Sequence, residues 1–131
     1  MAIDFTFSQD VEDARLMMRQ FLHETVKPAF AAMSENKEAT RDDWSKLVKS
    51  LRQQAKAEGY WLPHMPQEVG GMGLGVTALA AVSAEAAKVP MGPYIINAQA
   101  PDEGNMHTLY HFATDYQREH FLRPLLEGTA R

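Results

Sequence analysis

TRDDWSKLVKSLRQQAKAEG, residues 40–59, carries the clearest secondary-structure signal in the sequence. Thr40 followed by Asp43 resembles a capping box, in which each side chain accepts a backbone N–H at the start of a helix. Gly59 stands where a left-handed residue would close that helix. The spacing predicts a helix between these two ends, because the apolar residues recur at steps of three and four: Trp44, Leu47, Val48, Leu51 and Ala55.

Residues 8–26, which precede this helix, also combine a capping residue with a periodic apolar face. Ser8 is a favourable N-cap, and Asp10 and Glu12 lie in the first turn, where the helix dipole favours acidic groups. We expect Pro28 to end or kink this element near residues 26–30, since proline disfavours the helical conformation before it. One face of the predicted helix is apolar: Val11, Ala14, Met18, Phe21, Leu22 and Val26.

The rest of the sequence also favours helices. Residues 59–75 hold two prolines and five glycines, which predicts a long ordered loop. An alanine-rich helix is predicted over about 77–88, another over 101–112, and a last helix begins at the capping box of Thr114. We find no period-two pattern typical of strands, so the predicted fold is all-α, a multi-helix bundle forming one domain over residues 1–131.

Composition and charge exclude several classes of protein. The 131 residues have a formal net charge of −4, which disfavours a nucleic-acid binder or a polybasic membrane anchor. The sequence contains no cysteine, which excludes disulfides, thiolate nucleophiles and iron–sulfur ligation. No apolar run is long enough for a membrane span, and the first seven residues do not resemble a signal peptide. We therefore expect a soluble, cytoplasmic chain.

Three local patterns invite a chemical interpretation. Residues 70–75, GGMGLG, could bring backbone amides to a phosphate, but their spacing fails the dinucleotide fingerprint, which favours a tight structural connection. Glu103, His107 and His111 share one helix face and could bind a metal, but this spacing is common by chance, so we predict no metal site. Ser83 lies inside the alanine-rich helix, where we expect it to be buried or to serve packing.

Three longer segments resemble the N-terminal helical domain of the acyl-CoA dehydrogenases. The first is AEGYWLPHMPQEVGGMGL at residues 57–74, where Val69 replaces the usual aromatic residue. The second, APDEGNM at residues 100–106, is similar to a segment in a branch that includes enzymes for long-chain acyl-CoAs. The third is TDYQREHFLRPLLEG at residues 114–128, similar to the closing helix of the domain. The resemblance covers nearly the whole chain, and these three segments carry its most specific part.

The resemblance implies part of an oxidoreductase that converts an acyl-CoA to its trans-2-enoyl-CoA with FAD as cofactor. In the family, a carboxylate takes the α-proton while the β-hydrogen leaves as hydride to the flavin. A middle β-domain holds most flavin contacts, and a C-terminal helical domain supplies the glutamate base. The sequence ends at Arg131, where that middle domain would begin. We therefore expect no catalytic residue, no bound flavin and no activity in the 131-residue chain alone.

In the family, the N-terminal domain walls one side of the cavity for the acyl chain. The matching positions place Asn105, Met106 and Leu109 near the acyl tail as substrate-binding residues. Core packing explains Met106 and Leu109 equally well. The resemblance assigns no flavin-binding residue within this chain.

Two interpretations of the chain remain. As the N-terminal domain of a dehydrogenase, it would expose an apolar face that other domains normally cover, and we expect it to self-associate through that face. As a standalone helical module, it would bind an acyl or lipid ligand, or a protein partner, through a methionine-rich surface.

Overall fold

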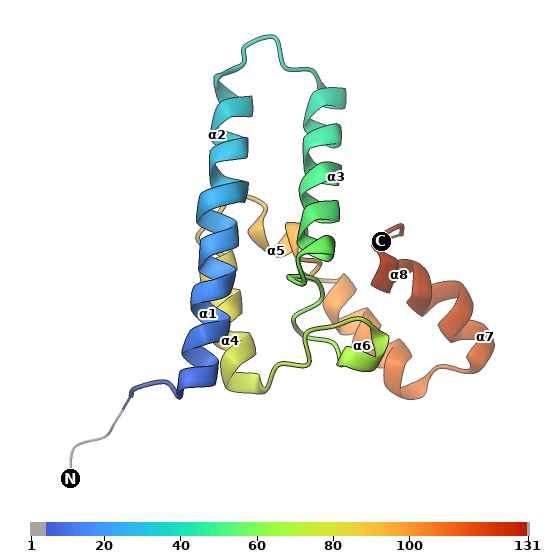
Figure 1. The fold of residues 1–131 in the computed structure, drawn as a ribbon. Coiled ribbons are helices and arrows are strands. Elements are labelled where there is room, and N and C mark those ends of the chain that lie inside the picture. Colours follow the sequence, from blue (N-terminus) through green and yellow to red (C-terminus); the bar gives the residue numbers. More distant parts are fainter. Residues whose placement is uncertain (1–4, 131) are drawn as a thin grey trace.

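The computed structural model describes residues 5–130, and over that range it is helical and contains no strand. Its tallest feature is a helical hairpin (Figure 1). One arm consists of α1 (Gln9–Phe21), the π-helical turn η1 (Leu22–Val26) and α2 (Lys27–Glu35). The other arm is α3 (Arg41–Ala57), which runs antiparallel to it. The predicted all-α fold is confirmed.

Pro28 does not end the first arm. The helix continues to Glu35, and the disturbance is confined to the π-helical turn η1 just before the proline. Proline lacks an N–H, and its ring clashes with the carbonyl group four residues earlier. The wider π turn gives that carbonyl room, so the chain stays helical through Pro28, and the expectation that the proline could end this helix is wrong.

The capping signals of α3 are confirmed at both ends. The Thr40 hydroxyl accepts the Asp43 N–H at 3.2 Å, and the Asp43 carboxylate accepts the Thr40 N–H at 2.9 Å. At the other end Gly59 adopts a left-handed φ of +84°. Leu51 and Ala55 point into the core, while the remaining apolar residues of the predicted stripe are half-buried.

The alanine-rich helix α4 (Val76–Ala86) packs along α1, and the short α5 (Gly92–Ile95) contacts both α4 and α3. The buried face of α4 includes the carboxylate of Glu85 as well as alanine and valine side chains. Ser83 is exposed, so the expectation that it is buried or serves packing is wrong. The reason is its position on the helix, on the side opposite to the face that meets α1.

The C-terminal third is a second layer beside the hairpin (Figure 1). It contains α6 (Asp102–Phe112), α7 (Asp115–Gln117), the π-helical turn η3 (Arg118–Leu122) and α8 (Arg123–Glu127). The capping box at Thr114 is present, with the hydroxyl accepting the Gln117 N–H at 3.3 Å. As in the first arm, a π turn stands just before a proline, here Pro124.

Residues 59–75, here called the core loop, run through the interior at residues 61–65, whereas several residues of its second half are exposed. It contains one short 3-10 turn, η2 (Gln67–Val69), and it buries Trp61, Leu62 and Met65 between the two layers. The Leu62 N–H donates to the carbonyl of Ile96, and the Trp61 indole donates to that of Leu126 at 2.8 Å. The loop therefore joins the hairpin to the C-terminal layer. Within residues 5–130, no helix is both long and apolar enough to cross a bilayer.

Candidate functional site

One cavity contains residues that the family resemblance places near the acyl chain, and it lies between α6 and the η3–α8 segment. It has a volume of about 520 Å³ and opens to solvent. Asn105 and Leu109, one turn apart on α6, line one wall, so two of the three residues assigned to the acyl chain lie in one cavity. The opposite wall is mostly apolar. The remaining lining residues are Thr108, His120, Phe121, Pro124, Leu125 and Ala130.

Met106 does not reach this cavity. Its side chain is completely buried, and it packs in the main core on the inner side of α6. The helical period explains why Met106 lies in the core while Asn105 and Leu109 line the cavity. Positions 105 and 109 share a helix face, and position 106 is turned from position 105 by about 100°. Met106 thus holds the cavity wall in place from behind.

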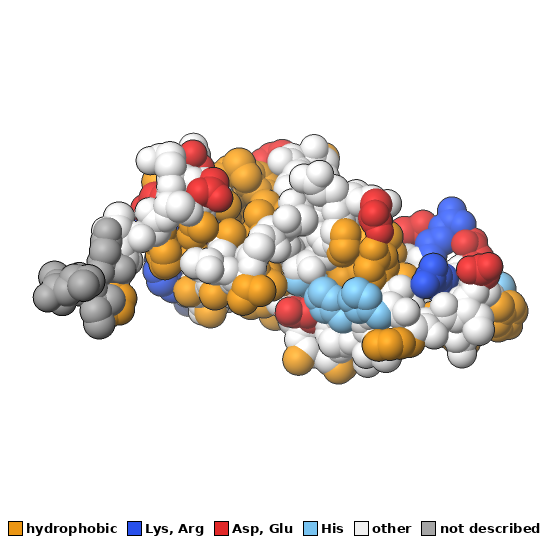
Figure 2. All heavy atoms as spheres, turned by 90° about the horizontal axis from the view of Figure 1, so that it is seen from below, with side chains coloured by type: hydrophobic (Ala, Val, Ile, Leu, Met, Phe, Trp, Pro, Cys, Tyr) orange, Lys and Arg blue, Asp and Glu red, His pale blue; other side chains and the backbone are white. Residues whose placement is uncertain are grey.

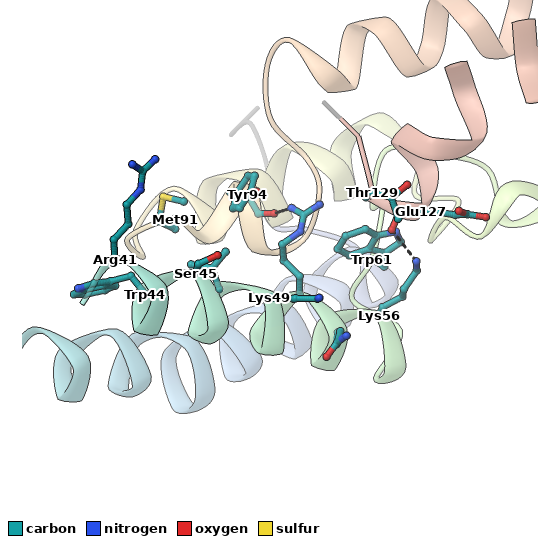
Figure 3. Close-up of a pocket in the computed structure, with 14 residues that line it drawn as sticks. Arg41, Trp44, Ser45, Lys49, Lys56, Trp61, Met91, Tyr94, Glu127 and Thr129 are labelled. Carbon is teal, nitrogen blue, oxygen red and sulfur yellow. Dashed lines mark hydrogen bonds between the residues drawn. The ribbon is translucent and has the colours of Figure 1, made fainter. Parts of the chain in front are cut away.

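A larger groove, of about 950 Å³, runs between α3, α5 and the end of α8 (Figure 3). Two of its cationic side chains, Arg52 and Lys56, are held by neighbouring groups. The Arg52 guanidinium lies 4.3 Å from the centroid of the Tyr94 ring and 4.8 Å from that of Trp61, and it donates to the Tyr94 carbonyl. Lys56 donates to the Glu127 carbonyl at 3.0 Å. The groove contains none of the residues assigned to the acyl chain.

The glycine-rich segment does not fit a phosphate cradle. Its amides are used inside the loop: the Gly71 N–H donates to the Pro66 carbonyl at 3.0 Å and the Gly73 N–H to the Met65 carbonyl at 2.9 Å. A Cβ on Gly71 would lie 2.0 Å from the Met65 carbonyl oxygen, so glycine is needed here for close packing of the backbone. These residues therefore do not fit the pyrophosphate of FAD, and they support the structural interpretation of the segment.

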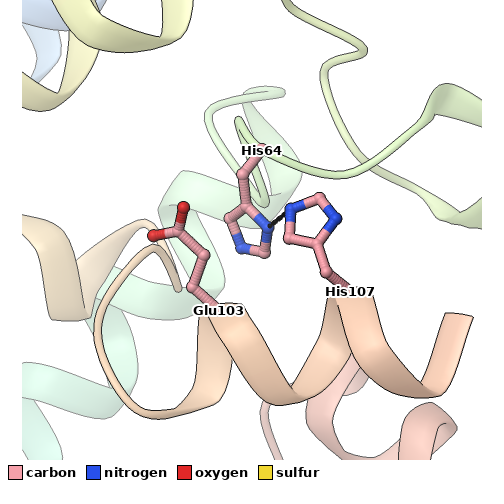
Figure 4. Close-up of side chains that lie close together, drawn as sticks. All are labelled: His64, Glu103 and His107. Carbon is pink, nitrogen blue, oxygen red and sulfur yellow. Dashed lines mark hydrogen bonds between the residues drawn. The ribbon is translucent and has the colours of Figure 1, made fainter. Parts of the chain in front are cut away.

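The histidines of α6 are arranged differently from the helical triad that the sequence suggests. Glu103 and His107 come together with His64 of the core loop, and one ligand atom from each lies within 4.8 Å of the other two (Figure 4). His111 is not part of this group; its ring centroid is 6.4 Å from that of His107. Burial lowers the pKa of His64, which keeps its ring neutral near pH 7. Helical spacing could not reveal His64, because it belongs to another segment.

Comparison with known proteins shows to which family this helical architecture belongs. The model of the acyl-CoA dehydrogenase N-terminal domain matches residues 8–129. A solved structure assigned to the acyl-CoA dehydrogenases, from Mycobacterium abscessus, superposes with a TM-score of 0.82 at 28% identity and covers 97% of this chain. The chain therefore belongs to the acyl-CoA dehydrogenase family, in which it corresponds to the N-terminal helical domain.

Relatives of known sequence agree with this assignment. Acyl-CoA dehydrogenase family member 11 of chicken (Gallus gallus) is 33% identical over 129 residues, which is 95% of this chain. FadE2 of Mycobacterium tuberculosis, assigned as an acyl-CoA dehydrogenase, is 32% identical over 98% of the chain. The chain spans only 16% of the length of the chicken protein, 32% of that of FadE2 and 34% of the solved M. abscessus chain.

Proposed function

We propose that this chain forms the N-terminal wall of the acyl-chain pocket in an FAD-dependent acyl-CoA dehydrogenase. The observation that supports the proposal is the cavity lined by Asn105 and Leu109, since family resemblance independently assigns both positions to the acyl tail. Met106 supports the same wall from the core side. The mostly apolar lining suits a hydrocarbon chain, which gains free energy when it leaves water.

In this proposal the chemistry takes place outside the 131 residues. FAD would accept the hydride, and a glutamate base would take the proton, both on parts of a longer protein. The first test is to read the coding DNA beyond codon 131. A frame that continues into a flavin-binding domain supports the proposal, and a stop codon directly after codon 131 contradicts it.

Filling the cavity should change the preference for acyl-chain length. In the protein encoded by the complete reading frame, Asn105→Trp places an indole where the distal part of a long acyl chain would lie. We expect kcat/KM for long acyl-CoAs to fall roughly tenfold or more, with little change for short ones, because a few methylene contacts are worth that much. Steady-state assays with acyl-CoAs of graded length measure the effect.

The control is Ser83→Trp, which adds the same ring at an exposed site on α4, away from the cavity. It should leave the chain-length preference unchanged. An Asn105→Trp enzyme that treats long and short substrates alike would contradict the assignment of this cavity to the acyl chain.

The alternative function, a standalone module that binds an acyl ligand or a protein partner, predicts a different result. Titration calorimetry of the 131-residue chain with a long-chain acyl-CoA should then show saturable binding that Asn105→Trp abolishes. Absence of a heat signal over a range of temperatures would remove the acyl-binding form of this alternative.

We also propose that the chain self-associates through exposed aromatic side chains of α6, α7 and η3. Phe112, Tyr116 and Phe121 are exposed by 84%, 65% and 54%, and exposed aromatic groups of this kind favour association. Phe112→Asp with Phe121→Asp should shift the chain to a smaller species in sedimentation velocity. The control is Val76→Asp, which removes an exposed apolar side chain at the start of α4. A wild-type chain that is monomeric at high concentration would contradict the proposal.

A further inference from the structure

Three potential metal ligands from two segments converge where the core loop meets α6 (Figure 4). His64 comes from the loop of residues 59–75, while Glu103 and His107 are one helical turn apart on α6. His64 Nδ1 and His107 Nε2 are 3.3 Å apart. Two nitrogens bound to one tetrahedral zinc ion, at about 2.0–2.1 Å each, lie about 3.3 Å apart. A usual hydrogen bond from a ring N–H is shorter, about 2.9 Å.

The hydrogen bonding of His64 leaves Nδ1, the ring nitrogen that faces His107, as the one that could bind a metal. His64 Nε2 lies 3.1 Å from the carbonyl oxygen of Asn97, which can only accept, so Nε2 carries the proton. Nδ1 is then unprotonated and points to His107. A backbone carbonyl behind a histidine is a common arrangement in metal sites, because it fixes the tautomer and the ring orientation. Asn97 is itself held by α8, since its amide donates to the Leu125 carbonyl at 2.9 Å.

The site is buried on one side and open on the other. His64 is only 6% exposed, whereas Glu103 and His107 are half-buried, so an ion could enter from their side. A cavity of about 260 Å³ opens beside His107; it is lined by the three histidines His64, His107 and His111 and by other residues of the loop, but not by Glu103. Figure 2 shows histidine side chains gathered on this face of the molecule, between areas of hydrophobic side chains. This cavity leaves room for a water molecule as a fourth ligand.

We propose that His64, Glu103 and His107 bind a divalent transition-metal ion of the zinc class, with a water molecule completing the coordination. Two imidazoles and one carboxylate are a ligand set that suits Zn²⁺, and Co²⁺ and Ni²⁺ as its substitutes. The ion would connect the core loop to α6 and so stabilise the junction of the two layers. The proposal does not depend on the dehydrogenase function.

The test uses the untagged 131-residue chain, so that no added histidines compete. Titration calorimetry with Zn²⁺ should show binding of one ion per chain, and Co²⁺ should give the visible absorption of a tetrahedral site. His107→Ala should lower the affinity by about tenfold or more, since even residues behind the ligands contribute that much. Glu103→Gln should weaken binding as well. Thermal unfolding of the wild-type chain should shift upward in Zn²⁺, because the ion binds the folded state.

His111→Ala is the matched control, because it removes a histidine that lines the same cavity but lies outside the cluster. Its affinity for Zn²⁺ should equal that of the wild-type chain. Equal binding by His107→Ala would overturn the proposal, and so would a loss of binding in His111→Ala. Circular dichroism of each variant confirms that the helices are intact, and His64→Gln is added only if it retains the wild-type spectrum.

Discussion

Gly71→Ala is expected to lower the free energy of unfolding by about 3 kcal/mol or more, the upper range for overpacking a core. The new methyl group would lie 2.0 Å from the carbonyl oxygen of Met65 and 2.8 Å from that of Leu62. Both contacts are with backbone atoms, and both residues are completely buried, so neither can move aside without disturbing the core. Urea denaturation followed by circular dichroism measures the loss.

The matched control is Gly104→Ala in the first turn of α6. Gly104 is exposed, and an added Cβ meets nothing within 4 Å. Alanine is the better helix former by about 1 kcal/mol, so this variant should be as stable as the wild type or more so. If Gly71→Ala were equally well tolerated, the loop of residues 59–75 would not pack as described.

Arg15→Ala is expected to have the second large effect, a loss of unfolding free energy clearly greater than that of removing a surface ion pair, because it takes away one partner of a buried carboxylate. Arg15 of α1 reaches across to α4, where its Nη1 lies 2.6 Å from Oε1 of the buried Glu85. The other carboxylate oxygen of Glu85 has no hydrogen-bond partner among the described residues. Without Arg15, the Glu85 carboxylate would keep one ion-pair partner, Lys88, whose Nζ lies 3.1 Å from Oε1.

Arg123→Ala is the control, because Arg123 forms ion pairs with Glu119 and Glu127 that are exposed on the surface. Exposed ion pairs contribute about 1 kcal/mol or less to the free energy of unfolding. An equal effect of the two substitutions would contradict the view that burial of Glu85 makes its pairing important. The Arg15→Ala and Glu85→Leu double variant should recover part of the loss, because it leaves no unpaired buried charge.

The pH dependence of stability provides a second measure of the same ion pair. Burial alone would raise the pKa of Glu85, but hydrogen bonds from Lys88 and Arg15 outweigh it and lower the pKa below 4.5. The unfolded chain therefore takes up the proton first. The stabilisation is complete above about pH 4.5 and is lost as the pH falls through the folded-state pKa. Glu85→Gln should make the acid limb of the stability curve shallower.

Local signals were sufficient to predict most helices. The capping boxes at Thr40 and Thr114 mark helix starts correctly, and Gly59 marks a helix end, because each signal depends on residues within one turn. The possibility that Pro28 ends the helix was wrong for a related reason. Proline opposes a regular α-helix, but the rule does not consider a π turn that moves the opposing carbonyl aside.

Contacts between distant segments could not be predicted from spacing. Glu85 was not recognised as buried, because its partner Arg15 lies seventy positions away in the sequence. His64 was missed as a neighbour of His107 for the same reason, since the two are brought together only when the core loop packs on α6. For the proposed acyl site, family resemblance supplied the positions, while the helical face that separates Met106 from Asn105 required the structure.

The two π-helical turns, Leu22–Val26 and Arg118–Leu122, each close their hydrogen bonds over one residue more than an α-turn does. Each is followed two positions later by a proline, Pro28 or Pro124. Deleting one residue from the first turn would rotate Phe30 and everything beyond it on α2 by about 100° away from the core. We therefore expect the extra residue and the proline to be coupled in evolution. Single-residue gaps among homologues should accumulate at these two turns, in the lineages that have also lost the proline.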